Sequence, residues 1–282
     1  MQRKISPDKI AKYIGRILSL TAVIYLGFYF YSLFTRNKNY VDISDLIFPI
    51  LLFAFVSMGC VSLNALTYYY ILKDVFKTVP PFRDIWEIYV SANICKYLPT
   101  NVMHFVGRNI LAEKYNISQK RMFQSTLYEI LNTVLATVLF CGTLAVIHYG
   151  LHYLLLLFIP VIFLLKKHNA LVPFLLVMLV TLINNTVVVI LYNLYSGQEL
   201  ICQFNQVSFY QSVSWLIGFL TPGAPAGIGI KEFVLIRISP GELVERLSVV
   251  VILQRVVLIL GDAGAYLMVR IRQLQQKKTI ME

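Results

Sequence analysis

The sequence predicts an all-helical polytopic membrane protein with about six spanning helices and two re-entrant, broken-helix hairpins. Three observations favour this class. Of the 282 residues, 58% are hydrophobic and 14% are charged, and the mean hydropathy is +0.69, which excludes an ordinary soluble domain. Apolar runs long enough to cross a bilayer recur along the whole chain. Two further apolar segments are interrupted by proline, glycine and charge.

The predicted spans rest on the length of about 20 apolar residues that crosses the hydrocarbon core. They cover 14–34, 46–71, 122–148, 170–195 and 243–269, with a shorter candidate at 151–165. The shorter run can cross where the bilayer thins around it. The first run is preceded by basic residues and lacks a small-residue cleavage site, so it predicts a span rather than a signal peptide. We expect one membrane domain over 1–282, with halves at about 1–149 and 150–282.

The two interrupted segments, at 85–107 and 208–235, are predicted to be hairpins. The first is broken at Pro99–Asn101, and the second is broken from Pro222 to Gly227. Proline removes a backbone donor, and glycine adopts geometries closed to other residues. Non-helical backbone survives at membrane depth only inside protein or beside a wet cavity. Each break therefore predicts a functional site.

The distribution of Lys and Arg supports this topology. With both termini in the cytoplasm, 18 of the 25 basic residues fall inside, 4 fall outside and 3 lie in the membrane. Arg108 is counted here in an inside loop at 108–121. Cytoplasmic loops carry such an excess and face an anionic lipid leaflet. The net charge of +11 is thus explained by the membrane, and no nucleic-acid partner is expected.

Each half then contains two spans, a hairpin and a further span, and the two halves start on opposite sides. This is an inverted repeat, in which the site lies near the midplane where the hairpins meet. A weak sequence correspondence accompanies it: Pro99 precedes Arg108 by nine residues, and Pro222 precedes Lys231 by nine.

Six ionisable side chains are predicted at membrane depth: Lys96, Glu129, Lys231, Glu232, Arg255 and Asp262. A charge at the bilayer centre costs at least about 2.5–3.5 kcal/mol, so such groups usually pair or face a polar cavity. Three bases and three acids favour pairing among themselves. They form either an ion-pair network that orients helices or a path for substrate or protons.

The hairpins point to an anionic ligand. A half-helix that starts after a break directs its N–H groups at the midplane, where they favour anions such as phosphate. Lys96, Arg108 and Lys231 add positive charge nearby. Alternatively, proline and glycine simply cap packed helices. The candidate substrate-binding residues are Lys96, Pro99, Asn101, Arg108, Glu129, Pro222, Gly223, Gly227, Gly229, Lys231, Glu232, Arg255 and Asp262.

Motifs for catalysis and cofactors are missing from the sequence. There is no P-loop, GxSxG or HExxH motif and no aspartate cluster for a magnesium-pyrophosphate. The four cysteines form no CxxC pair, and the four histidines lack metal-ligand spacing. We therefore expect no catalytic residue, metal or cofactor.

The charged and broken segments resemble the flippase-like membrane family, which includes the N-terminal membrane region of lysylphosphatidylglycerol synthase. The resemblance spans nearly the whole chain and rests on Lys96-Tyr-Leu-Pro99, Gly107-Arg108, Glu129, Pro222-Gly-Ala-Pro-Ala-Gly-Ile-Gly-Ile-Lys-Glu232, Arg255 and Gly261-Asp262. The common Pro-Gly-Gly core is extended here to residues 222–227, and Ile130 follows Glu129 where members often have Arg.

The resemblance implies movement of a lipid between the leaflets of the cytoplasmic membrane. The expected cargo is an anionic phospholipid or a polyprenyl-phosphate-linked sugar, and the expected partner is a glycosyltransferase of surface glycolipid or polysaccharide assembly. The synthases carry a soluble aminoacyltransferase domain after the membrane region. No such domain follows here, so lipid aminoacylation is not expected.

Two other functions fit the same sequence. One is a membrane accessory protein that recruits a glycosyltransferase through the loop around 114–121 and moves no lipid. The other is a membrane-embedded transferase acting on lipid-linked sugars, with Glu232 or Glu129 as a base.

Overall fold

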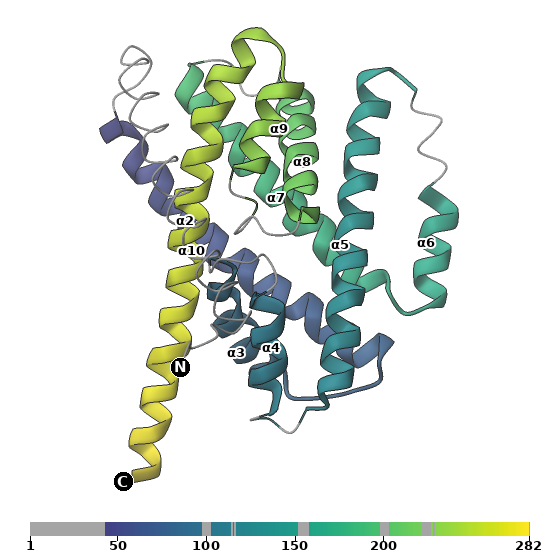
Figure 1. Ribbon diagram of the computed structural model, residues 1–282, viewed down its shortest axis with the longest axis vertical. Helices are drawn as coiled ribbons and strands as arrows, with labels where there is room; N and C mark the ends of the chain where they lie inside the picture. The colour runs from purple at the N-terminus through teal and green to yellow at the C-terminus, as the bar shows by residue number, and fades with distance from the viewer. Residues whose placement is uncertain are drawn as a thin grey trace, which may run out of the picture.

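The computed structural model describes residues 43–97, 103–113, 115, 117–151, 158–197, 203–221, 227 and 229–281. Within these residues the chain forms nine α-helices and two short helical segments of other types, and no β-strand (Figure 1). The predicted all-helical class is confirmed. The span predicted at 14–34 lies outside the described residues.

Three helices are long and apolar enough to cross a membrane. They are α2 (Ile43–Tyr70), which continues into a π-helix (Ile71–Val75), α5 (Gln119–His148) and α7 (Leu171–Ser196). They contain 28, 30 and 26 residues, and about 20 suffice. They coincide with the spans predicted at 46–71, 122–148 and 170–195, so the chain is a membrane protein.

Two more helices overlap segments that were predicted to span, without being among the three helices above. α6 (Phe158–Lys167) has 10 residues, about 15 Å of helix, and residues 152–157 before it lie outside the described part. The short span at 151–165 therefore stays a prediction. α10 (Gly241–Met281) has 41 residues and contains the span predicted at 243–269. Its C-terminal end extends beyond α3 and α4 in Figure 1.

Both segments predicted to be hairpins are helical on each side of their breaks. In the first, α3 (Phe82–Asn93) and a 3-10 turn (Ile94–Tyr97) precede α4 (Met103–Glu113). In the second, α8 (Phe204–Leu220) precedes α9 (Ile230–Ile238). The two helices of each pair pack against one another. The pairs are called the first and second hairpin below. α4 runs six residues past the predicted end at 107.

The helices of the two halves have corresponding neighbours. α2 packs against α3, α5, α7 and α10, whereas α7 packs against α8, α10, α2 and α5. α5 packs against α4 and α8, whereas α10 packs against α9 and α3. Every one of these contacts is reproduced when α2, α3, α4 and α5 are exchanged with α7, α8, α9 and α10. The matched helices α5 and α10 run in opposite directions (Figure 1).

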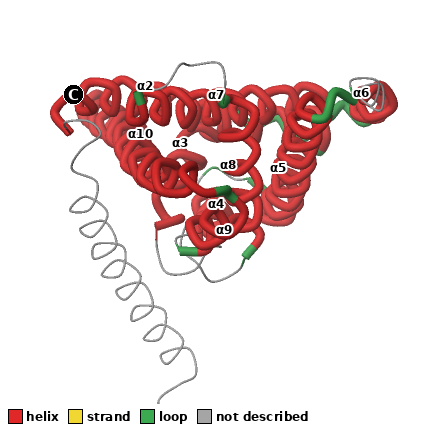
Figure 2. The backbone as a smooth tube through the Cα atoms, turned by 90° about the horizontal axis from the view of Figure 1, so that it is seen from above, coloured by secondary structure: helices red, strands yellow, loops and turns green. Residues whose placement is uncertain are grey.

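The hairpins are stacked along the long axis of the molecule. Figure 1 places the first hairpin toward one end and the second toward the other. In Figure 2, seen along that axis, α4 and α9 overlap on one side of the molecule, opposite α2 and α7. The long helices thus form a wall on which both hairpins pack.

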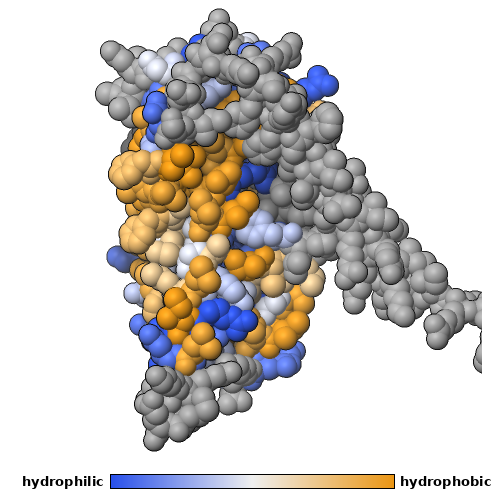
Figure 3. Space-filling view, turned by 90° about the vertical axis from the view of Figure 1, so that its left-hand side faces the viewer, coloured by the Kyte–Doolittle hydropathy of each residue, from blue (hydrophilic) through white to orange (hydrophobic). Residues whose placement is uncertain are grey.

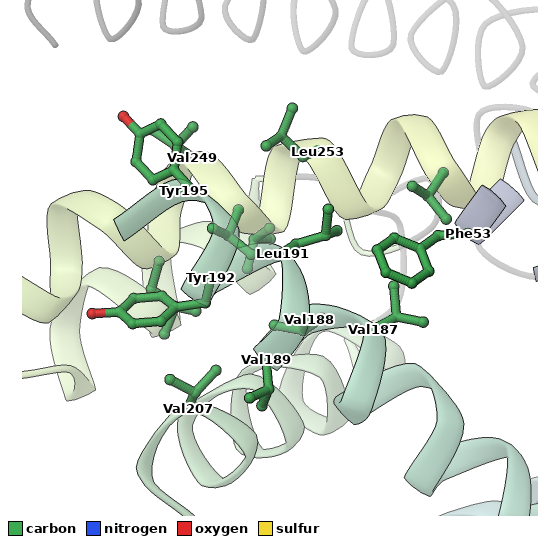
Figure 4. Packing of buried hydrophobic residues seen from close by; sticks show 14 of the residues in the cluster. Phe53, Val187, Val188, Val189, Leu191, Tyr192, Tyr195, Val207, Val249 and Leu253 are labelled. Carbon is green, nitrogen blue, oxygen red and sulfur yellow. The ribbon is translucent and has the colours of Figure 1, made fainter. Parts of the chain in front are cut away.

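Branched aliphatic side chains fill the core on the α10 side of this wall. Val and Leu residues of α7 and α10 pack together, with Phe53 of α2 beside Val187 at one end of the cluster and Val207 of α8 near Val189 (Figure 4). A second cluster centred on Tyr68 and Ile88 joins α2, α3 and the start of α5. Apolar side chains also cover much of the outer face shown in Figure 3, as expected for contact with lipid.

Candidate functional site

Seven ionisable side chains gather where the two hairpins meet α5 and α10. They are the bases Lys96, Arg108, Lys231 and Arg255 and the acids Glu129, Glu232 and Asp262. All four bases and three acids were predicted as site residues. Whether they bind a substrate stays a prediction.

The first ion pair joins α4 to α5. Arg108 Nη1 donates to Glu129 Oε2, and the hydroxyl of Tyr89 donates to Glu129 Oε1 at 2.8 Å. The guanidinium carbon of Arg108 lies 3.8 Å from the ring centroid of Tyr89 and 5.0 Å from that of Tyr68. Aromatic faces attract such a cation.

Arg108 is only 2% exposed, so its predicted place in a cytoplasmic loop is wrong. It lies inside α4, because the helix continues past the predicted end of the hairpin and Glu129 neutralises its charge.

The second ion pair joins the first hairpin to α10. Lys96 Nζ lies 2.6 Å from Asp262 Oδ2, and Asn93 Nδ2 donates to Asp262 Oδ1 at 2.6 Å. The hydroxyl of Tyr97 also donates to Oδ2. Three donors, one from the end of α3 and two from the 3-10 turn after it, therefore hold a buried carboxylate, which satisfies the hydrogen-bonding needs of a buried charge.

The third ion pair joins the second hairpin to α10. Arg255 Nε lies 2.6 Å from Glu232 Oε1, and Arg255 Nη2 donates to the carbonyl of Gly227 at 3.3 Å. The other oxygen of Glu232 accepts the N–H of Gly229, the N-cap of α9, at 2.8 Å. This backbone donor, predicted to face a ligand, is thus used by the helix's own carboxylate.

Lys231 differs from the other three bases. It is 5% exposed, and no described carboxylate lies within 4 Å of its Nζ. Nζ donates to Gln254 Oε1 at 2.9 Å, and Gln211 Nε2 of α8 donates to the same oxygen at 2.6 Å. An ammonium with one neutral acceptor has little compensation for its lost hydration.

Glycines bring the backbones near these charges unusually close. A Cβ added at Gly227, where φ is +68°, would lie 3.1 Å from the carbonyl oxygen of Gly218, and one at Gly218 would lie 3.3 Å from Lys231 Cβ. A Cβ at Gly261 would lie 2.6 Å from Ser57 Oγ of α2. Gly227, with its positive φ, and Gly261, with its 2.6 Å approach, require glycine, and these approaches bring α8 close to the start of α9 and α10 close to α2.

A separate polar cluster lies where the first hairpin meets the C-terminal part of α10. Glu87 of α3 accepts hydrogen bonds from Tyr115 at 2.9 Å and Gln273 at 3.4 Å, and it lies 3.5 Å from Arg83. Burial, and then the nearby carboxylate of Glu87, raises the pKa of Tyr115 to about 12. The phenol thus stays protonated at neutral pH and keeps donating, so this cluster anchors the hairpin.

The sequence predicted the ionisable residues but missed their neutral partners. Tyr89, Asn93 and Gln211 were not singled out, although Asn93 lies three residues before Lys96, at helical spacing. Gln211 is an amide in a segment that the sequence places at membrane depth, which is itself a signal because a buried amide needs hydrogen-bond partners. The predicted site residues Pro99, Asn101, Pro222 and Gly223 lie outside the described residues.

Comparison with protein-family models, curated protein sequences and solved structures finds no match for this chain. Its function is therefore inferred from the geometry of the buried charges.

Proposed function

We propose that the protein moves an anionic lipid, either a phospholipid or a polyprenyl-phosphate-linked sugar, between the leaflets of the cytoplasmic membrane. In this proposal the chain has about six spans and two re-entrant hairpins, with both termini in the cytoplasm. The headgroup enters between the hairpins, and its tails stay in the surrounding lipid. The cargo then serves a glycosyltransferase that builds a surface glycolipid or polysaccharide.

The corresponding helix neighbours of the two halves support an inverted repeat. Exchange of α2–α5 with α7–α10 reproduces the packing, and α5 and α10 run in opposite directions. Many transporters are built in this way, with the substrate site where broken helices of the two repeats meet. The same arrangement allows one half to tilt against the other.

One observation carries the proposal: within the second hairpin of a membrane protein, beside α10, a buried lysine has no carboxylate partner among the described residues. Charged groups inside a membrane usually mark the path of a substrate or an ion. Lys96, Arg108 and Arg255 each have an acid partner. Among the described residues Lys231 has only the amide oxygen of Gln254 as an acceptor, so an anion is the ligand that best compensates its charge.

The ion pairs at α10 offer a mechanism for exposing this lysine to each leaflet in turn. Lys96–Asp262 holds the first hairpin to α10, and Glu232–Arg255 holds the second. Breaking one pair frees its hairpin and opens the space around Lys231 toward one side. An anionic headgroup that reaches Arg255 competes with Glu232 and lowers the free energy needed for that opening.

Proteoliposomes test the proposal. Vesicles containing tail-labelled fluorescent phosphatidylglycerol are treated with dithionite, which bleaches only the outer leaflet. We expect the wild-type protein to expose the inner-leaflet label to bleaching. We expect the Lys231→Ala, Glu232→Ala double variant to be slower by about ten-fold or more, the factor that corresponds to 1.4 kcal/mol.

The matched control is the Lys166→Ala, Lys167→Ala double variant, which removes two charges from an exposed turn and should transport like the wild type. Bleaching no faster than in protein-free vesicles would exclude transport of this lipid. Equal rates for the wild type and the Lys231→Ala, Glu232→Ala variant would show that the site is elsewhere.

A further inference from the structure

We infer that the cargo carries one negative charge, in a phosphodiester, and presents a hydroxyl group beside that phosphate. This inference rests on the proposed function and narrows it. It selects lipids in which a polyol or sugar is joined through a single phosphodiester. It excludes phosphomonoesters, pyrophosphate-linked sugars and zwitterionic headgroups as preferred ligands.

The charge balance of the site indicates that the cargo carries one negative charge. The seven ionisable side chains comprise four bases and three acids, and three bases have an acid partner among the described residues. One positive charge, on Lys231, is then left when cargo is bound, because a bound anion stabilises the ammonium form. A monoanion neutralises the site. A phosphomonoester carries about 1.5–2 negative charges, so it leaves buried negative charge uncompensated.

The orientation of two glutamine amides indicates that the cargo presents a hydroxyl group. Lys231 Nζ can only donate, so it fixes the oxygen of the Gln254 amide toward itself. That oxygen also accepts from Gln211 Nε2, which fixes the Gln211 amide in turn. Both side chains are nearly fully buried, at 4% and 3% exposed.

This chain of contacts leaves one acceptor unused. Gln211 Oε1 is buried and has no hydrogen-bond partner among the described residues. Reversal of the amide would place two oxygens against each other, so the free atom must be an acceptor. A buried acceptor without a donor is costly, and a hydroxyl on the headgroup supplies the donor. Lys231 and Gln211 lie on the two helices of one hairpin and both donate to Gln254 Oε1, so they are close enough for one headgroup to reach both.

A phosphodiester with a neighbouring hydroxyl occurs both in phospholipids and in prenyl-phosphate-linked sugars. Binding to the purified full-length protein in detergent micelles distinguishes these two sources. Phosphatidylglycerol, phosphatidylmethanol and phosphatidic acid compete with tail-labelled phosphatidylglycerol. The first is a diester with hydroxyls, the second is a diester without them, and the third is a monoester. A short-chain prenyl phosphodiester of a hexose and the matching pyrophosphate form the second set. The source is whichever diester binds more tightly.

We expect phosphatidylglycerol to bind about ten-fold more tightly than phosphatidic acid and several-fold more tightly than phosphatidylmethanol. The prenyl phosphodiester should likewise bind about ten-fold more tightly than the matching pyrophosphate. Equal or tighter binding of the monoester or the pyrophosphate would overturn the charge assignment. Equal binding of phosphatidylglycerol and phosphatidylmethanol would overturn the hydroxyl assignment. These comparisons use the wild-type protein and need no variant to fold.

Variants then locate each preference. Gln211→Leu should remove the hydroxyl preference and keep the charge preference. Lys231→Gln should remove the charge preference, and Lys231→Arg should retain it. Lys167→Gln, at an exposed position, should change neither. If the protein binds these lipids selectively but does not transport lipid in vesicles, the proposed function is rejected and this inference stands. If it transports lipid but does not select among these headgroups, this inference is rejected and the proposed function stands.

Discussion

The two hairpins differ in how their charges are balanced. In the first hairpin the two bases of the central cluster, Lys96 and Arg108, have a carboxylate from α10 or α5. In the second hairpin Glu232 is paired with Arg255, and Lys231 has only neutral partners within the part of the chain that the structure describes. The first hairpin therefore resembles a fixed structural element, and the second carries the excess charge. A variant series can test whether this difference is real.

The largest effect is expected at the fully buried pair of the first hairpin. Glu129→Gln leaves the guanidinium of Arg108 buried without a carboxylate. This should lower the free energy of unfolding by about 3–5 kcal/mol. Equilibrium unfolding in detergent micelles, followed by tryptophan fluorescence or circular dichroism, measures it. The Arg108→Met, Glu129→Leu double variant removes both charges and should cost less. A loss below about 1 kcal/mol for Glu129→Gln would contradict the role of the pair.

The second-largest difference in stability between the hairpins is expected for glycine-to-alanine substitutions, because the backbones approach more closely in the second hairpin. Gly227→Ala places a side chain at a left-handed φ and 3.1 Å from the Gly218 carbonyl oxygen. This should cost about 2–4 kcal/mol. Gly107→Ala in the first hairpin meets Ala92 Cβ at an ordinary 3.5 Å. It should be tolerated or gain about 0.5–1 kcal/mol as a glycine replaced within a helix. The same unfolding measurement serves both, and similar costs would refute the difference.

Glu232→Gln should have a smaller effect than Glu129→Gln. The amide can still accept the N–H of Gly229, and Arg255 keeps the Gly227 carbonyl and some solvent access. A loss of about 1–2 kcal/mol in the free energy of unfolding is expected. Glu232→Ala also removes the N-cap acceptor and should cost about 1 kcal/mol more. Equal losses for Gln and Ala would show that the cap contributes nothing.

The smallest effect is expected for Lys231→Met, which should stabilise the protein rather than destabilise it. Lys231→Met replaces a buried charge that lacks an acid with an apolar side chain of similar length. It should raise the free energy of unfolding by about 1 kcal/mol, at the expense of lipid binding. The exposed Lys167→Met is the control and should stay within about 0.5 kcal/mol of the wild type. Destabilisation by Lys231→Met comparable to that of Glu129→Gln would remove the distinction between the hairpins.

Local periodicity and composition predicted much of the fold. The spans over α2, α5 and α7 and both broken segments follow from runs of apolar residues and from proline and glycine, which act within a few residues. The spacing of Gly229 and Glu232 is likewise local and is typical of a helix start. Helix ends were predicted less well, since α4 continues past 107 and buries Arg108.

The choice of partners could not be predicted from the sequence. Lys96 and Asp262 are 166 residues apart, and their pairing depends on how α3 packs against α10. Arg255 and Asp262 lie seven residues apart on α10, yet each pairs with a different hairpin. Partner choice in a charged cluster depends on the packing of whole helices, which a single sequence does not encode locally.

α10 makes the two hairpins thermodynamically dependent on each other. Arg255 and Asp262 are two turns apart, about 10.5 Å along one rigid helix, and each contacts a different hairpin. An axial shift of α10 therefore changes both ion pairs at once. We expect a perturbation at Lys96 to alter the strength of the Glu232–Arg255 contact, and the reverse effect must then be equal in free energy. Double-mutant cycles between Lys96 and Glu232 should thus give a coupling energy although the two side chains belong to different hairpins.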